Sequence, residues 1–260
     1  MLVYPQLESG AVSQFPVRKR RRLRTVTNRA SDGTSVKLAD PTGAVTEWSL
    51  PYTALTDGEA AALQQFFADA EGTLKEFTFL DPTTNLLAWS DRLDHAAWQH
   101  GPQLSMLGGI ADPQGGTNAW HLVNGGGGAQ SVTQTIPAPG GYLYCLSAYV
   151  RSAEGAIVTM LLGNERAERT AGAEWRRIVF AASGDAAAES ITFGLEIPAG
   201  MEVDSFGMQV EPRAGAGVYQ ATTTGGVYEG ARLRDDELSI TTTGDNRHST
   251  TVNIIHANHL

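Results

Sequence analysis

Short runs of alternating apolar and polar residues are the dominant pattern of this chain, and they predict a mainly β fold. In the N-terminal part, strands are expected over residues 15–28, 34–39, 44–50 and 74–80. Turn residues separate the first three strands, and the sequences Ser31-Asp32-Gly33 and Asp40-Pro41-Thr42-Gly43 are each expected to reverse the chain.

One segment of this region has helical spacing instead. Thr56 and Glu59 are placed to form a capping box, in which their side-chain oxygens accept hydrogen bonds from exposed amides at a helix start. Apolar residues then recur on one helical face: Ala60, Leu63, Phe66, Phe67 and Ala70. Gly72 is expected to end the helix.

From residue 85 onward the chain is rich in glycine, alanine and short alternating segments, without a strong helical pattern. Strands are expected over residues 119–123, 131–136, 142–150, 156–162, 175–181, 191–197 and 202–210. Many short strands separated by turn residues are typical of an antiparallel β-sandwich or jelly roll.

The last residues predict three more strands, over 229–233, 237–242 and 249–256, with a turn at 244–246. Two or three strands alone are only marginally stable, so they must join a sheet elsewhere. We therefore expect residues 1–83 and 226–260 to form one small β-barrel or sandwich with a single helix. Residues 84–225 would then be an inserted antiparallel jelly-roll β-sandwich. Three serial pieces with a loose C-terminal tail remain the alternative.

Composition narrows the possible functions. The 260 residues include 28 acidic and 19 basic side chains, a net charge of −9, which disfavours general binding of nucleic acid. No apolar run approaches the ~20 residues that cross a bilayer, and the first residues do not resemble a secretory signal, so we expect synthesis in a cytoplasm. The single cysteine, Cys145, excludes an intrachain disulfide and a multi-cysteine zinc site.

Basic residues are concentrated in one run near the N-terminus. It consists of Arg18, Lys19, Arg20, Arg21, Arg22 and Arg24. Because apolar residues flank the run, we expect a strand with cationic side chains on one or both faces. Three interpretations stay open: a solvated strand or oligomer rim, a surface for an anionic protein, and a nucleic-acid site. The last is disfavoured because no aromatic residues are interleaved for base stacking.

Two ordered series of short motifs resemble known families. The first resembles the N-terminal β domain of distal tail proteins of long-tailed phages, and comprises residues 4–7, 13–16, 32–33, 48–52 and 77–82. The second resembles the carbohydrate-binding-module-like jelly roll of many phage tail proteins, and comprises residues 85–87, 98, 144–151, 175–177, 206–211 and 218–222. Each motif is short, but together they cover nearly the whole chain.

The resemblance implies a structural virion protein of the tail tip. Such a protein forms an oligomeric ring, commonly of six copies, and joins the tail tube protein to hub or tail-fibre proteins. It also implies a displayed domain with a host cell-surface glycan as its expected ligand, and it allows a structural calcium ion. The basic run from Arg18 to Arg24 is then the expected oligomer or partner interface. The alternative function is a free-standing or accessory carbohydrate-binding module of a polysaccharide-acting enzyme.

A glycan site would need outward-facing polar and aromatic side chains. Alternation along residues 144–151 places Tyr149 and Arg151 on the face opposite the core. In residues 204–211, Phe206, Met208 and Val210 are expected inward, and Gly207, Gln209 and Glu211 outward. If these two strands are neighbours, Tyr149, Arg151 and Gln209 line a polar groove, which Glu196 could join. Trp120 and Tyr142 lie near glycine-rich loops and are further candidates. An ordinary solvated sheet face is the alternative.

Motifs of known catalytic chemistry are lacking. The sequence contains no Gly-x-Ser-x-Gly, no His-Glu-x-x-His and no Gly-x-x-x-x-Gly-Lys-Ser/Thr. Cys145 lies in an apolar strand and is expected to be a packed thiol rather than a nucleophile. We therefore expect a non-enzymatic protein with no catalytic residue, no bound cofactor and no assigned metal ligand.

Overall fold

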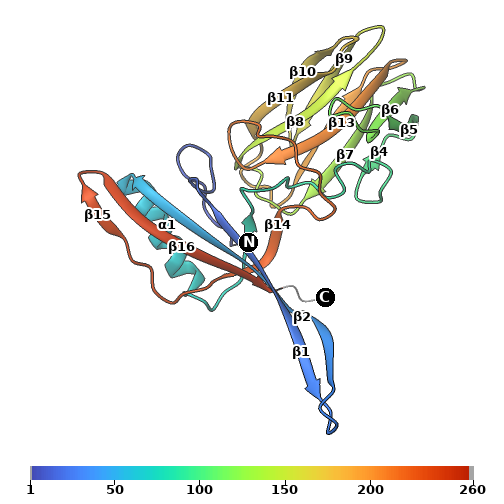
Figure 1. The fold of residues 1–260 in the computed structure, drawn as a ribbon. Coiled ribbons are helices and arrows are strands. Elements are labelled where there is room, and N and C mark those ends of the chain that lie inside the picture. Colours follow the sequence, from blue (N-terminus) through green and yellow to red (C-terminus); the bar gives the residue numbers. More distant parts are fainter. Residues whose placement is uncertain (1, 258–260) are drawn as a thin grey trace. The chain divides into compact units, whose positions relative to one another are not determined.

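The computed structural model describes residues 2–257, and the chain divides into two compact units (Figure 1). Of the described residues, 2–7, 13–79 and 228–257 form the helix-bearing unit. The sandwich unit comprises residues 8–12 and 80–227. Residues 258–260, which the sequence assigned to the first domain, lie outside the described residues.

The helix-bearing unit is built on one antiparallel sheet. Its strands follow the order β1 (Arg18–Arg29), β2 (Ser35–Leu55), β16 (Arg247–Ala257), β14 (Val227–Leu233) and β3 (Phe77–Leu80), and β15 (Thr241–Gly244) pairs with β16. The C-terminal strands thus pair with β2, with Val252 opposite Leu50 and Ile254 opposite Trp48. These four residues are buried and belong to the core of the unit.

The single helix, α1 (Asp57–Ala70), confirms the helical pattern. Thr56 accepts a hydrogen bond from the Glu59 amide, and the Glu59 side chain accepts one from the Thr56 amide, so the capping box is formed. The chain leaves the helix through Glu71 and Gly72, both in the left-handed region at φ 52° and 64°. Phe66 lies on the buried face and packs edge-on against Tyr4, 5.1 Å between ring centroids.

The turn expected at residues 40–43 is wrong, because β2 continues through it. Arg22 lies opposite Val45 and Arg24 opposite Asp40, so one residue of β1 faces four of β2 in a large bulge. The local turn chemistry is nonetheless present, since the Asp40 carboxylate accepts hydrogen bonds from Thr42 Oγ1 at 2.7 Å and Gly43 N at 3.2 Å. These bonds bend β2 without reversing it.

The sandwich unit enters and leaves the sheet at adjacent strands. The Asp81 amide donates a hydrogen bond of 2.8 Å to the Gly226 carbonyl, directly beyond the pairing of β3 with β14. The two ends of the segment between these residues therefore lie within hydrogen-bond distance of each other. In addition, residues 8–12 belong to the sandwich unit, which the sequence did not indicate.

The sandwich unit consists of two five-stranded antiparallel sheets. The first follows the order β10 (Glu165–Ala171), β9 (Ala156–Leu162), β12 (Ile191–Ile197), β7 (Gln130–Ile136) and β4 (Gln99–His100). The second follows the order β11 (Arg176–Ser183), β8 (Leu143–Arg151), β13 (Glu202–Glu211), β6 (Ala119–Asn124) and β5 (Leu104–Ile110). Their inner faces form the core, where Tyr144 of β8 meets Phe193 of β12 edge-on at 5.3 Å. The expected mainly β architecture is confirmed.

Three strands were not predicted from the sequence. β10 carries charged residues at four of its seven positions and has only one buried residue, as befits a solvated edge strand. β5 is an edge strand with two glycines, and β4 is two residues long. Hydrophobic alternation detects strands that bury one face, and none of these three does so strongly.

Among the described residues, α1 is too short and too polar to cross a lipid bilayer, and no other α-helix is present.

Candidate functional site

A row of polar side chains crosses the outer face of the second sheet. Asp204 of β13 lies directly opposite Arg151 of β8 on one side and His121 of β6 on the other. Residues opposite one another in an antiparallel sheet point to the same face. The outward position of Arg151 agrees with the strand alternation, whereas His121 and Asp204 were not singled out from the sequence. We call Arg151, Asp204 and His121 the polar row.

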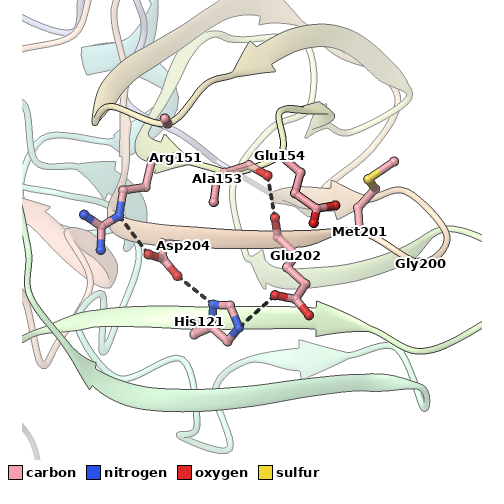
Figure 2. A pocket seen from close by; sticks show the side chains of 10 residues that line it. His121, Arg151, Ala153, Glu154, Gly200, Met201, Glu202 and Asp204 are labelled. Atoms are coloured by element: carbon pink, nitrogen blue, oxygen red, sulfur yellow. Dashed lines mark hydrogen bonds and ion pairs between the residues drawn. The ribbon is translucent and has the colours of Figure 1, made fainter.

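Asp204 connects the row through both of its oxygens. Arg151 Nε donates to Oδ2 at 2.8 Å, and His121 Nδ1 lies 2.7 Å from Oδ1 (Figure 2). Because a carboxylate only accepts, Nδ1 of His121 carries a hydrogen, and Nε2 is a second donor only when the ring is protonated. This Nε2 lies 3.5 Å from the Glu202 carboxylate. The row therefore holds the Arg151 and His121 side chains in fixed orientations.

An open cavity of about 480 Å³ lies beside the polar row. Its lining includes the three members of the row together with Glu154, Met201 and Glu202, as Figure 2 shows. The Glu202 side chain is 64% exposed and Arg151 32%, whereas Asp204 is only 16% exposed. Exposed donors and acceptors thus surround a space of the size that small ligands occupy.

Aromatic rings border the polar row. The Arg151 guanidinium lies over the Trp175 ring, 4.7 Å from its centroid. The next outward pair along β13 and β8 is Phe206 and Tyr149, whose ring centroids are 6.0 Å apart. Phe206 also meets Tyr219 edge-on, at 5.1 Å between centroids. Tyr149 and Trp175 are half-buried and pack on this cluster. Apolar ring faces and polar groups therefore share one sheet face, the combination that sugar rings with their hydroxyls require.

Phe206 corrects the expected alternation of β13. It lies opposite Tyr149 on the outer face, whereas it was expected inward. A bulge follows at Gly207, whose φ of 64° is in the left-handed region, and the register shifts before Gln209. A Cβ on Gly207 would lie 3.1 Å from the Tyr219 ring, so this glycine also allows that ring to cover Phe206. Strict alternation cannot reveal such a shift.

The predicted groove residue Gln209 is outward but covered. Its Nε2 donates to Glu211 at 2.8 Å, and its Oε1 accepts from the Gln220 amide at 2.8 Å. Glu211 also binds Arg213 and the Gly217 amide. These bonds hold residues 212–220, which we call the strap, over this half of the sheet face, and Gln209 is only 1% exposed. Of the three expected groove residues, only Arg151 lines the cavity, whereas Tyr149 and Gln209 do not.

The other predicted residues lie elsewhere. Glu196 belongs to β12 of the first sheet, where it forms an ion pair of 3.0 Å with Arg166, so it does not join Tyr149 and Arg151. Trp120 precedes His121 on β6 and so points to the opposite face, where its Nε1 donates to the Asp91 carbonyl at 3.0 Å. Tyr142 precedes β8, at the other end of that strand from Arg151. Its partial burial raises the pKa of its hydroxyl to about 12.

Cys145 is a packed thiol on the strap-covered half of the face. It is fully buried, and burial, assisted by the nearby Glu211 carboxylate, raises its pKa to about 11. At neutral pH it is therefore protonated, which disfavours a nucleophilic role.

No cluster of three or more His, Cys, Asp or Glu side chains arranged to hold a metal ion occurs within residues 2–257. The loop acid Asp112 instead binds its own loop, with Oδ1 accepting from the amides of Gln114 at 2.8 Å and Gly116 at 3.0 Å. Burial opposes ionisation here, but these amides outweigh it and hold the pKa of Asp112 below its usual value. The structural calcium ion stays a prediction.

The basic run occupies β1 of the helix-bearing unit. Its members are all exposed: Arg18, Lys19, Arg20, Arg21, Arg22 and Arg24. Glu47 of β2 binds Arg20 and lies 3.5 Å from Arg22 and 3.9 Å from Arg234, while Asp40 binds Arg24. Lys19 lies 5.6 Å from the centroids of both Trp48 and Tyr228. Cationic side chains on both faces of this strand agree with the sequence.

Comparison with known proteins finds similar solved structures but no similar family or curated protein. No protein family and no curated protein matches the chain. The C-terminal family 22 carbohydrate-binding module of Clostridium thermocellum xylanase Xyn10B is 12% identical with a TM-score of 0.43, and the match covers 54% of this chain and 99% of that module.

Two further likenesses involve larger proteins. The N-terminal carbohydrate-binding and catalytic modules of the same xylanase, solved with xylohexaose, are 14% identical with a TM-score of 0.40, over 51% of this chain. The enzymatically active domain of tailspike protein 4 of bacteriophage CBA120 is 10% identical with a TM-score of 0.40, also over 51%. The matched region spans only 28% and 22% of those two chains.

Proposed function

We propose that the sandwich unit is a non-catalytic carbohydrate-binding module and that the cavity beside the polar row is its binding site. The observation that carries the proposal is the polar row itself, which holds Arg151 and His121 beside a cavity of about 480 Å³. Ring hydroxyls of a saccharide would bind Arg151, His121 Nε2 and Glu202. An apolar sugar face would lie against Trp175, whose ring adjoins the Arg151 guanidinium.

The experiment is a glycan array followed by calorimetry on the full chain. Arg151→Ala should weaken binding on the order of tenfold, the equivalent of one lost charged hydrogen bond of ~1.5 kcal/mol, and Trp175→Ala should weaken it through the lost stacking face. Arg166→Ala is the matched control, because Arg166 is an ion-paired arginine on the other sheet. Arg151→Lys, which keeps the charge near Asp204, separates lost binding from lost folding.

Two results would contradict this function. One is the absence of binding to any saccharide on the array. The other is equal weakening by Arg151→Ala and Arg166→Ala. Release of new reducing ends from a bound polysaccharide would contradict the non-catalytic part alone.

A second candidate function is assembly into a phage tail tip, where the protein would be made in the host cytoplasm and located in the virion. The resemblance of the N-terminal motifs supports it, and so does the fully exposed basic strand β1. The helix-bearing unit would form a homo-oligomeric ring, of six copies by resemblance, between the tail tube and the hub or fibre proteins. The sandwich unit would then present its site to a host cell-surface glycan.

Native mass spectrometry at low and high salt tests this candidate. Joint replacement of Arg20, Arg21 and Arg22 by glutamate should weaken assembly, whereas replacement of Arg166, Arg169 and Arg176 should not. An unchanged ring in the first variant contradicts the interface. Absence of the protein from purified particles contradicts the location.

A further inference from the structure

The outer edge of β1 is a long unpaired strand edge. Among the strands that the structure describes, β1 pairs with β2 alone, and all twelve of its residues are exposed. Beyond the bulge, Arg24–Arg29 and residues 35–40 of β2 form a ribbon with no third strand (Figure 1). Such an edge presents a row of backbone donors and acceptors that an added strand can satisfy.

Four arginines form a ladder on one face of this edge strand. Arg18, Arg20, Arg22 and Arg24 lie at alternate positions, so successive side chains are about 6.7 Å apart. The side chains of the last three are 62%, 61% and 67% exposed. Residues 18–47 carry eight basic and three acidic side chains in a chain whose net charge is −9. The positive charge is therefore concentrated on β1, a long free edge of this sheet.

The face becomes apolar towards the tip of the ribbon. Val26 lies directly opposite Leu38, and Val36 lies two residues before Leu38 in β2, nearer the tip of the ribbon. These three side chains are 39%, 51% and 53% exposed. An added strand would therefore meet arginines along residues 18–24, the root of β1, and aliphatic side chains near the tip of the ribbon, at Val26, Val36 and Leu38.

These features restrict what can occupy the edge. A second β1 would place arginine opposite arginine, which is unfavourable. The chain also contains no three acidic residues at successive alternate positions, so a second copy cannot supply a complementary strand. Residues 18–46 contain no aromatic side chain for base stacking, which disfavours a single-stranded nucleic acid.

We propose that the free edge of β1 accepts an extended acidic segment of another protein as an added strand. Acidic side chains at alternate positions of that segment pair with Arg18, Arg20, Arg22 and Arg24. An apolar residue of the same segment then lies against Val26 and Leu38. The proposal is independent of glycan binding, and its partner is not a second copy of this chain.

The test uses the full chain and a fluorescent synthetic peptide in which glutamate alternates with threonine and one end is valine. A peptide of the same length and charge with proline at the threonine positions is the control, because each proline removes one backbone N–H donor. We expect saturable binding of the alternating peptide, at least tenfold weaker binding of the proline peptide, and slowed amide exchange in β1.

Variants separate this strand addition from general charge attraction. Replacing Arg18, Arg20, Arg22 and Arg24 by glutamine should reduce peptide affinity at least tenfold, whereas glutamine at Arg166, Arg169, Arg176 and Arg213 should leave it unchanged. Circular dichroism checks that both variants are folded. Equal binding of the two peptides, no peptide binding at low salt, or tighter binding of a single-stranded oligonucleotide would each overturn the proposal.

Discussion

Single side chains determine which part of the sandwich surface is open to a ligand. Asp204 accepts from Arg151 with one oxygen and binds His121 with the other, and so positions one group on each of the two strands that flank β13. Gln209, only a few residues further along β13, is covered by the strap. Alternation predicted the outward direction of Arg151 and Gln209 equally well. It could not predict their different exposure, because the strap is held by contacts distant in sequence.

Glu47 gives a pH-dependent prediction at this scale. It is buried at the root of β1, and its hydrogen bond to Arg20, aided by Arg22 and Arg234, lowers its pKa. A lowered pKa stabilises the fold fully above the unfolded value of about 4.3, and this stabilisation is lost as pH falls through the folded value. The difference in unfolding free energy between the native chain and Glu47→Gln should therefore be constant above about pH 5 and shrink at lower pH.

Urea unfolding at a series of pH values measures this difference. Glu237→Gln, at an exposed acid, is the control and should follow the native chain throughout. A difference that stays constant down to the acid-unfolding range would show that Glu47 contributes by packing rather than by charge.

At the scale of elements, local signals were sufficient where an element is defined by its own residues. The helix α1 and its capping box, and the buried strands β9 and β12, follow from spacing alone. The bulge at residues 41–44 and the bulge at Gly207 did not, because a partner strand defines each of them. Edge strands such as β10 were missed for another reason: they bury little of their own surface and so lack a strong hydrophobic alternation.

The Gly207 bulge yields a prediction for the outer sheet face. Gly207→Ala forces a Cβ into a left-handed conformation and towards the Tyr219 ring. It should destabilise the chain by about 1–2 kcal/mol in urea unfolding and displace Tyr219 from Phe206. A changed near-ultraviolet circular dichroism signal would report the displaced ring.

Gly127→Ala is the matched control, because a Cβ at Gly127 meets no atom within 4 Å. It should change the unfolding free energy by less than about 0.5 kcal/mol. Equal effects of the two substitutions would refute the role assigned to the bulge.

At the scale of the whole molecule, two observations define an inserted unit. The C-terminal strand β16 pairs with β2, and the Asp81 amide binds the Gly226 carbonyl. The helix-bearing unit thus has its own sheet and helix, and the sandwich unit has its own two-sheet core. The need to place the last strands led to the expectation of an insertion over residues 84–225, and the sequence gave no sign that residues 8–12 belong to the sandwich unit.

Excision tests the independence of the helix-bearing unit. Replacing residues 82–225 by a short glycine-containing turn should leave a folded protein, because Asp81 and Gly226 are already within hydrogen-bond distance. We expect cooperative unfolding and dispersed amide signals, with sharp signals only from residues 8–12. Excising residues 100–209, which cuts through both sheets of the sandwich, is the control and should leave the remainder of that unit unfolded. Loss of cooperative unfolding in the first variant would refute independence.

The hydrogen bond between Asp81 and Gly226 also bears on how this protein can change over evolution. Any folded domain whose own two ends lie one strand spacing apart fits the same junction without altering the register of β3 and β14. Homologues should therefore keep the sheet and helix while exchanging the intervening domain for others of different binding specificity.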